Sequence, residues 1–178
     1  MRTAIPPRVV VGLSGSLNSL TALHRAATEA RLTGRTLLAV MAYGPRTGAQ
    51  HPYLSAPITE QSRHSAVQQL IRALEGALGA SRDDLPVEGF VVRGRPGPTL
   101  VGVARRADDI LVVGTGHRSR LSRAFLPSVA RYCLAHASCP VLAVPPSPLQ
   151  HDLEAMRRLN RRMVPWGLGA TDIQDFIF

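Results

Sequence analysis

The sequence contains no lysine, and all 21 of its basic residues are arginine. This absence excludes a P-loop of the form GxxxxGK[ST], which places a lysine against phosphates, and it excludes Schiff-base and lysine general-base chemistry. Cysteine is also scarce, since only Cys133 and Cys139 are present and neither stands at a zinc-site spacing from a second ligand. We therefore expect neither a disulfide framework nor a metal site.

Aromatic residues make up only 4% of the chain, too few for a stacking platform that would hold single-stranded nucleic acid. No apolar run approaches the ~18 residues that cross a membrane. The first residues, MRTAIPPRVVVG, contain no hydrophobic region of the signal-peptide type. The sequence favours a cytoplasmic location, no membrane partner and no specific binding of nucleic acid.

The net charge is strongly positive, +9 at neutral pH. Residues 1–146 hold 17 arginines against 8 acidic residues, whereas residues 147–178 hold 4 of each, so the excess lies in the first part of the chain. A surface this basic attracts polyanions non-specifically. A nucleic-acid binder driven by charge alone is therefore one alternative, and a steep salt dependence of binding to random DNA would support it.

The pattern of apolar residues alternates between strands and helices along the chain. A length of 178 residues with 45% apolar and 19% charged residues suits one globular domain with a tail. We predict strands at 8–12, 36–42, 86–92, 110–113 and 141–144, and helices at 17–31, 59–78, 99–107 and 127–137. Strict alternation with mainly apolar strands predicts an α/β fold, an open parallel five-stranded sheet with helices on both faces.

Arginines follow three of the predicted strands. In parallel sheets the carboxyl ends of the strands meet at one edge, and ligands bind there. An anionic ligand or partner at this edge is the expectation, although exposed charges also gather in ordinary loops. The arginines concerned are Arg46, Arg93, Arg95, Arg118, Arg120 and Arg123.

The turn after the first strand, Gly12-Leu-Ser14-Gly-Ser16, superficially resembles the nucleophile elbow G-x-S-x-G. Its last position is Ser16 instead of glycine. The chain is also short for an α/β-hydrolase, and no histidine follows a late strand, where a triad partner would stand. We therefore do not predict a serine hydrolase.

Three stretches carry a family resemblance: VVVGLSGSLNSLTALHRAATEA, VVRGRPGPTLVGVARRADDILVVGTGHRS and SVARYCLAHASCPVLAVP. These three stretches follow one another in order within residues 7–146, and this part of the chain resembles the universal stress protein family. The resemblance implies an open sheet of five parallel strands with helices on both sides, in agreement with the alternation. It also implies a homodimer formed through the last strand, Val141, Leu142, Ala143 and Val144.

Many members of that family bind ATP through a late motif, G-x-x-G-x9-G-[ST]. The matching residues here are Gly114-Thr-Gly116-His117 and, after nine residues, Pro127-Ser128. His117 replaces the second glycine, with Gly116 beside it. Pro127 replaces the third glycine, where it lacks the N–H that would approach a phosphate. The resemblance therefore implies an impaired phosphate loop.

Other positions of the implied nucleotide site lie earlier in the chain. The acidic residue that nucleotide-binding members carry near the ribose is replaced by Ser14, a weaker acceptor. The residues that the resemblance assigns to the site are Leu13, Ser14, Met41, Ala42, Gly114, Gly116, His117, Ser128 and Val129. We expect no tightly bound cofactor, with ATP or another adenine nucleotide as the alternative ligand.

The resulting hypothesis is a non-enzymatic universal stress-type regulatory or protective protein that acts as a homodimer. The first alternative is a stress sensor that binds ATP or another adenine nucleotide. The second is a small-ligand enzyme that uses the same cleft, although the sequence offers no nameable set of acid, base and nucleophile for it.

The last part of the chain, residues 147–178, lies outside the resemblance. Apolar residues at helical spacing between Leu149 and Met163 predict an amphipathic helix. Trp166 and the end, Phe176-Ile-Phe178, form an apolar tail after it. Because water-exposed aromatic residues lower solubility, we expect this segment to fold against the rest of the chain. We place the boundary between the two parts at Pro146.

Overall fold

The computed structural model describes residues 6–44, 60–79, 84–115 and 128–147. The chain divides into two units, residues 1–146 and residues 147–178. The predicted amphipathic helix and apolar tail, residues 148–178, lie outside the described residues. Within the described part, no helix is both long enough and apolar enough to cross a membrane.

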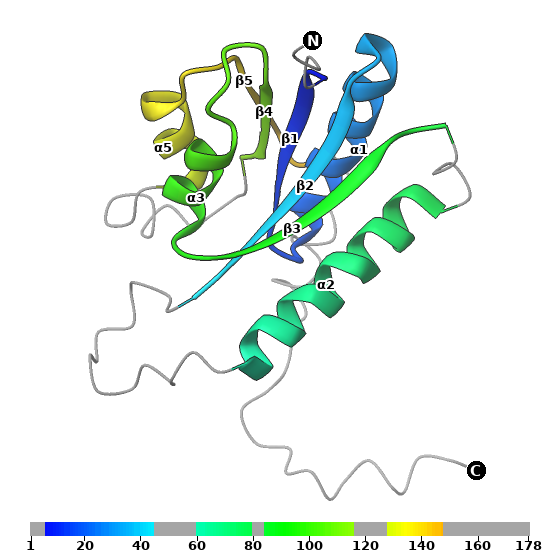
Figure 1. Ribbon diagram of the computed structural model, residues 1–178, viewed down its shortest axis with the longest axis vertical. Helices are drawn as coiled ribbons and strands as arrows, with labels where there is room; N and C mark the ends of the chain where they lie inside the picture. The colour runs from blue at the N-terminus through cyan, green and yellow to red at the C-terminus, as the bar shows by residue number, and fades with distance from the viewer. Residues whose placement is uncertain (1–5, 45–59, 80–83, 116–127, 148–178) are drawn as a thin grey trace, which may run out of the picture. The chain divides into compact units, whose positions relative to one another are not determined.

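Five parallel strands form a single sheet in the order β3-β2-β1-β4-β5 (Figure 1). The strands are β1 (Arg8–Leu13), β2 (Thr36–Tyr43), β3 (Val87–Arg93), β4 (Ile110–Gly114) and β5 (Val141–Val144). The described helices are α1 (Leu17–Thr33), α2 (Glu60–Leu78), α3 (Pro96–Val103) and α5 (Val129–His136). The predicted α/β fold is confirmed. The strand order reverses between β1 and β4, which places the topological switch point of the sheet there.

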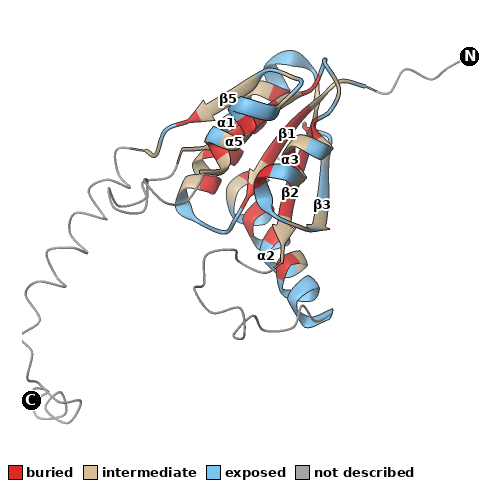
Figure 2. Cartoon of the chain, turned by 90° about the vertical axis from the view of Figure 1, so that its left-hand side faces the viewer, coloured by how far each residue is buried: buried red, intermediate tan, exposed pale blue. Residues whose placement is uncertain are grey.

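Helices cover both faces of the sheet, and two apolar clusters result. Because side chains alternate along a strand, Val9 and Val11 of β1 face α1 and α2, whereas Val10 faces α3 and α5. Buried residues accordingly follow the central strands and the inward sides of the helices (Figure 2). The buried face of α1 consists largely of alanines, so this helix approaches the sheet closely. Those alanines are Ala22, Ala26, Ala27 and Ala30.

Residues next to α1 cap both of its ends. Ser16 precedes the helix, and its hydroxyl accepts a hydrogen bond from the Ser19 N–H at 3.3 Å. Gly34 ends it in the left-handed conformation at φ 63°, which glycine adopts at no steric cost. The helix predicted at 17–31 is confirmed and runs two residues further, to Thr33.

The prediction for α3 was wrong in its bounds. We expected a turn through Pro98 and a helix over 99–107, whereas the helix runs from Pro96 to Val103. Prolines are tolerated in the first turn of a helix because the N–H groups there have no partner within it. The helix ends at Ala104, whose N–H still bonds to the Leu100 carbonyl but whose own backbone leaves the helical conformation at φ −88° and ψ 59°.

Both cysteines lie in packed surroundings, Cys133 within α5 and Cys139 just after it. Cys133 is fully buried, and burial raises the pKa of its thiol to about 11. Cys139 is partly buried, and its Sγ donates a hydrogen bond to the Ala104 carbonyl at 3.4 Å. Burial also raises the pKa of the Cys139 thiol. Because the thiolate is the reactive form, both side chains suit packing better than redox chemistry.

Candidate functional site

The switch point of the sheet brings the ends of β1 and β4 side by side. These two strands pair in parallel, with Val11 beside Val112, so Leu13 and Gly114 end neighbouring strands at the same edge. The Leu13 side chain is buried in the cluster beneath α1 and α2. Its contribution at the edge is therefore limited to its backbone.

The turn that follows β1 presents two serine hydroxyls. Ser14 and Ser16 are exposed, and their Oγ atoms lie 3.0 Å apart in hydrogen-bond contact. Between them Gly15 adopts φ +72°, a conformation that disfavours other residues. A Cβ at Gly15 would also lie 1.9 Å from Nε2 of Gln69 in α2. The turn is thus fixed by a glycine, and the Ser14 hydroxyl bonds to another hydroxyl instead of a base.

Gly114 allows β4 to approach the start of α1 closely. A Cβ at Gly114 would lie 2.8 Å from the backbone oxygen of Asn18. Beyond it, both the backbone N–H and the hydroxyl of Thr115 donate to the Val144 carbonyl, at 2.8 and 3.2 Å. The first glycine of the predicted phosphate motif therefore has a packing role in addition to any role toward a ligand.

Replacing Gly114 by alanine is expected to lower the free energy of unfolding by about 1–3 kcal/mol, because the new methyl group overlaps backbone that cannot rotate away. Urea denaturation measures this change. Gly76→Ala is the matched control, since a Cβ at this exposed position of α2 meets nothing within 4 Å. We expect that control to stabilise the helix by roughly 0.5–1 kcal/mol. Equal stability of the two variants would contradict the close approach.

The positions predicted to face adenine differ in their exposure. Met41 is buried beneath α1 and α2, whereas Ala42, the next residue of β2, is partly exposed. Backbone atoms of both residues lie at the carboxyl end of β2. This arrangement suits recognition through backbone atoms, which tolerates replacement of the side chains.

The second half of the predicted phosphate motif is described only from Ser128 onward. Ser128 caps α5, and its Oγ accepts a hydrogen bond from the Arg131 N–H at 3.1 Å. Val129 packs partly buried against the cluster beneath α3 and α5. Gly116, His117 and Pro127 lie outside the described residues. The hydroxyl of Ser128 is therefore engaged by its own helix.

Of the arginines predicted at the carboxyl edge, Arg93 and Arg95 are described and exposed, at the end of β3 and just before α3. The other four, Arg46, Arg118, Arg120 and Arg123, lie outside the described residues. The predicted basic edge therefore stays a prediction for most of its members.

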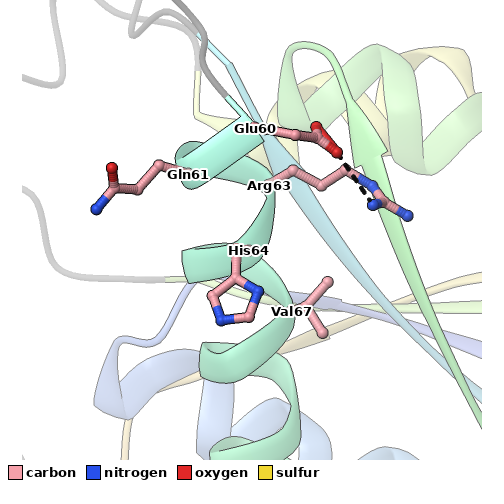
Figure 3. A pocket seen from close by; sticks show the side chains of 5 residues that line it. All are labelled: Glu60, Gln61, Arg63, His64 and Val67. Atoms are coloured by element: carbon pink, nitrogen blue, oxygen red, sulfur yellow. Dashed lines mark hydrogen bonds and ion pairs between the residues drawn. The ribbon is translucent and has the colours of Figure 1, made fainter.

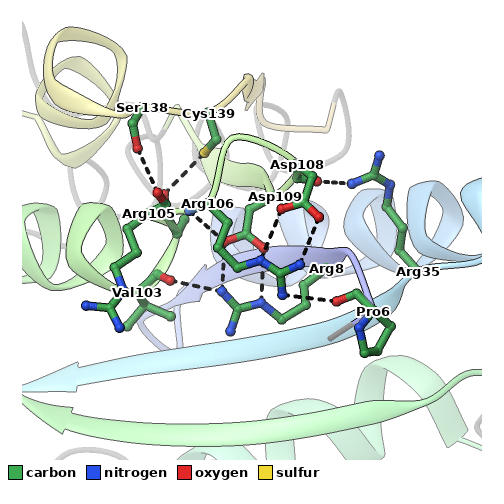
Figure 4. Close-up of polar contacts among 11 residues, drawn as sticks. Pro6, Arg8, Arg35, Val103, Arg105, Arg106, Asp108, Asp109, Ser138 and Cys139 are labelled. Carbon is green, nitrogen blue, oxygen red and sulfur yellow. Dashed lines mark hydrogen bonds and ion pairs between the residues drawn. The ribbon is translucent and has the colours of Figure 1, made fainter. Parts of the chain in front are cut away.

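Sequence reasoning missed a buried ion pair at the opposite, amino-terminal edge of the sheet (Figure 4). The Arg8 guanidinium donates to both carboxylate oxygens of Asp109, at 3.0 and 2.7 Å, and to the Val103 carbonyl at 3.2 Å. Asp109 is 0% exposed and also accepts from the Arg106 N–H at 3.3 Å. The hydrogen bond with Asp109 raises the pKa of Arg8. These contacts join β1, the end of α3 and the start of β4.

The signal for this pair was an acidic residue directly before an apolar strand and an arginine at the start of another. Locally, Asp109 caps the turn before β4 by accepting a hydrogen bond from the Arg106 N–H. Its contact with Arg8 spans 101 residues of sequence and depends on the pairing of β1 with β4. No local pattern reports such a contact.

Hollows on the described surface include two that contain no predicted site residue. The first lies on the opening turns of α2, lined by Glu60, Gln61, Arg63, His64 and Val67 (Figure 3). Arg63 forms an ion pair there with Glu60 at 3.5 Å. The second lies between β3 and the end of α3. We attach the nucleotide prediction to the strand ends, because ligands of open parallel sheets bind at the switch point.

Comparison with known proteins agrees with this arrangement. A sequence profile described as the universal stress protein family matches residues 7–145. A universal stress protein of Mycobacterium tuberculosis is 31% identical over 141 residues, which are 76% of this chain and 47% of that protein. A universal stress protein of Thermus aquaticus is 30% identical over 140 residues, covering 76% of this chain and 96% of that protein. This chain thus spans about half the length of the mycobacterial relative.

A solved structure also shares the fold. It is a universal stress protein crystallised in complex with cAMP, and it is 26% identical to this chain. The TM-score is 0.61, and the match covers 81% of this chain and 100% of the other.

Proposed function

This chain belongs to the universal stress protein family, and we propose that it is a non-enzymatic regulatory or protective protein, homodimeric, whose cleft binds ATP at most weakly. The observation that carries the proposal is the hydrogen bonding of the turn after β1. Ser14 stands where nucleotide-binding relatives carry an acid, and its hydroxyl bonds to Ser16. A hydroxyl whose partner is another hydroxyl is neither an activated nucleophile nor a strong acceptor for a ribose.

The phosphate side of the cleft supports the same proposal. The sequence places Pro127 and His117 at two glycine positions of the family motif. Proline removes an N–H donor, and any side chain restricts the close approach of backbone to phosphate. Ser128, the next residue, uses its hydroxyl to cap α5. The interactions lost are those that a triphosphate needs most.

An adenine-mononucleotide sensor is the second candidate, favoured by the relative crystallised with cAMP. A mononucleotide carries fewer phosphates, so the altered loop would cost it less affinity than it costs ATP. The backbone at Leu13, Met41 and Gly114 supplies the adenosine side of such a site. These strand ends are intact in the described part of the chain.

Calorimetry is expected to give a dissociation constant for ATP weaker than about 1 μM, which corresponds to less than about 8 kcal/mol of binding free energy. We also expect no hydrolysis of ATP. Changing Pro127→Gly together with Ser14→Asp should raise the affinity about tenfold or more, because it restores a donor position and an acceptor. Pro127→Ala is the control, since alanine restores the N–H without the freedom of glycine.

Micromolar or tighter binding of ATP by the wild-type chain would contradict the proposal. An affinity that does not rise in the double variant would show that the cleft is closed for another reason.

The proposed homodimer rests on β5. This strand lies at one edge of the sheet, pairs only with β4 within the described chain, and leaves Val141, Leu142 and Ala143 partly exposed. An apolar edge invites pairing with another strand, and a two-fold mate satisfies its free backbone groups.

A further inference from the structure

The opposite edge of the sheet, β3, exposes one face that no described helix covers. A Cβ at Gly89 would contact Leu70 and Leu74 of α2, so alternate residues from Val87 point toward α2. Glu88 and Phe90 therefore point to the other face, which they share with Leu38 and Val40 of β2. On this face α3 packs over β1 and β2, and Glu88 and Phe90 of β3 stay exposed.

Between β3 and α3 the surface forms a groove with two unlike walls. Phe90 and Glu88 belong to the β3 wall, and Leu38 lines the groove as well. Gly102, Val103 and Arg105 belong to the α3 wall. Phe90 is 50% exposed, an unusual exposure for an aromatic ring in the middle of a strand. Gly102 is exposed, and a Cβ there would meet nothing within 4 Å.

The charges of the groove fall into a paired and an unpaired set. Arg8 is paired with Asp109, and Arg106 with Asp108 at 2.8 Å. Glu88 and Arg105 are exposed and form no ion pair within the part of the chain that the structure describes. Glu88 lies near enough to Arg8 to help raise the pKa of that guanidinium, but the two form no ion pair. One wall thus carries the negative charge of Glu88, and the other wall carries the positive charge of Arg105.

Along the groove, the residues of the β3 wall and their complements on the α3 wall occur in the same order. The helices of such a sheet run antiparallel to the strands, so Arg105 at the end of α3 lies toward the same edge as Glu88 near the start of β3. Gly102 and Phe90 then follow together, farther along the groove. A second copy turned by a two-fold axis along the groove would set the β3 wall of each copy on the α3 wall of the other. Phe90 of each copy would then meet the open space at Gly102 of the other copy. Glu88 of each copy would likewise meet Arg105 of the other copy.

We infer that this groove is an interface with a second copy of the chain, in which Phe90 packs at Gly102 and Glu88 pairs with Arg105. The inference does not depend on the proposed cleft, and it uses the edge opposite to β5. With both edges engaged, the chain associates beyond a dimer.

Charge reversal tests the interface by sedimentation velocity on the full chain. Glu88→Arg brings two positive charges together in each contact, and Arg105→Glu brings two negative charges together. Each single variant should therefore associate about tenfold or more weakly than wild type. A mixture of the two single variants should restore the association. In a mixed pair, position 88 of each chain meets position 105 of the other chain, and both contacts then join opposite charges. The double variant should restore it as well.

Melting temperatures of both single variants check that the fold is unchanged. The failure of the β5 dimer can be told apart from the failure of this interface. If β5 pairs as proposed, charge reversal lowers the assembly to a dimer, and if it does not, charge reversal lowers a dimer to a monomer. Association that is unchanged in both single variants overturns the inference, and so does a mixture that fails to restore it. Phe90→Glu is a further variant, and an assembly that survives it also overturns the inference.

Discussion

Replacing Asp109 by alanine is expected to lower the free energy of unfolding by about 2–4 kcal/mol, the largest effect on stability that we predict for one residue, because the carboxylate is fully buried whereas Arg8 keeps some contact with water. The substitution leaves the Arg8 guanidinium without the carboxylate that accepts two of its hydrogen bonds. It also leaves the Arg106 N–H without its acceptor. Unfolding by urea, followed by circular dichroism, measures the change.

Asp108→Ala is the matched control. Asp108 stands next in sequence and also pairs with an arginine, Arg106, but its side chain is 50% exposed. Exposed ion pairs contribute about 0–1 kcal/mol, so this variant should remain close to wild type. A loss of less than about 1 kcal/mol in Asp109→Ala would contradict a stabilising role for the buried pair.

A double substitution separates the effect of an unpaired charge from the effect of the other contacts that Arg8 and Asp109 make. Arg8→Met with Asp109→Leu removes both charges together, so no buried charge is left unpaired. We expect this variant to recover part of the stability that Asp109→Ala loses. If the double variant is less stable than Asp109→Ala, the hydrogen bonds that Arg8 makes to Val103 and that Asp109 makes to Arg106 matter more than the charge.

Introducing charge on β5 is expected to abolish the pairing of this edge. Val141→Asp together with Ala143→Arg should weaken association through β5 at least about a hundredfold, because charges on an apolar edge must lose water on pairing. The change is best read in the Glu88→Arg background, where it appears directly as a dimer that becomes a monomer in sedimentation velocity.

Leu32→Asp serves as the control for this experiment. Leu32 is 76% exposed near the end of α1 and belongs to neither proposed interface, so a charge there should not alter association. A wild-type chain that is monomeric at tens of micromolar would contradict the β5 dimer, since a protein interface of ordinary size is populated at that concentration.

Much of the fold could be predicted because its signals are local. Continuous apolar runs such as Thr36–Tyr43 mark strands that are covered on both faces. Ser16 and Gly34 mark the ends of α1 through the hydrogen bonds that they make within a few residues. The bounds of α3 failed because prolines serve both turns and first helical turns, and the sequence alone does not distinguish the two uses.

The candidate site could be predicted only in part, because its residues meet through the sheet. The closeness of Gly114 to Asn18 depends on the packing of β4 against α1, and the Arg8–Asp109 pair depends on β1 lying beside β4. The family resemblance named Gly114 for its expected role toward phosphate, but it did not report that the glycine also makes room for α1. The groove between β3 and α3 had no sequence signal, since an exposed phenylalanine looks like any other strand residue.

Native mass spectrometry of the wild-type chain with equimolar ATP, AMP and cAMP reports which nucleotide stays bound and whether any is converted. We predict that the chain carries no ATP and forms no ADP, and an adduct with AMP or cAMP alone would support the mononucleotide sensor. One ATP retained per chain would refute weak ATP binding, since it would show that Pro127, His117 and Ser14 do not impair the cleft.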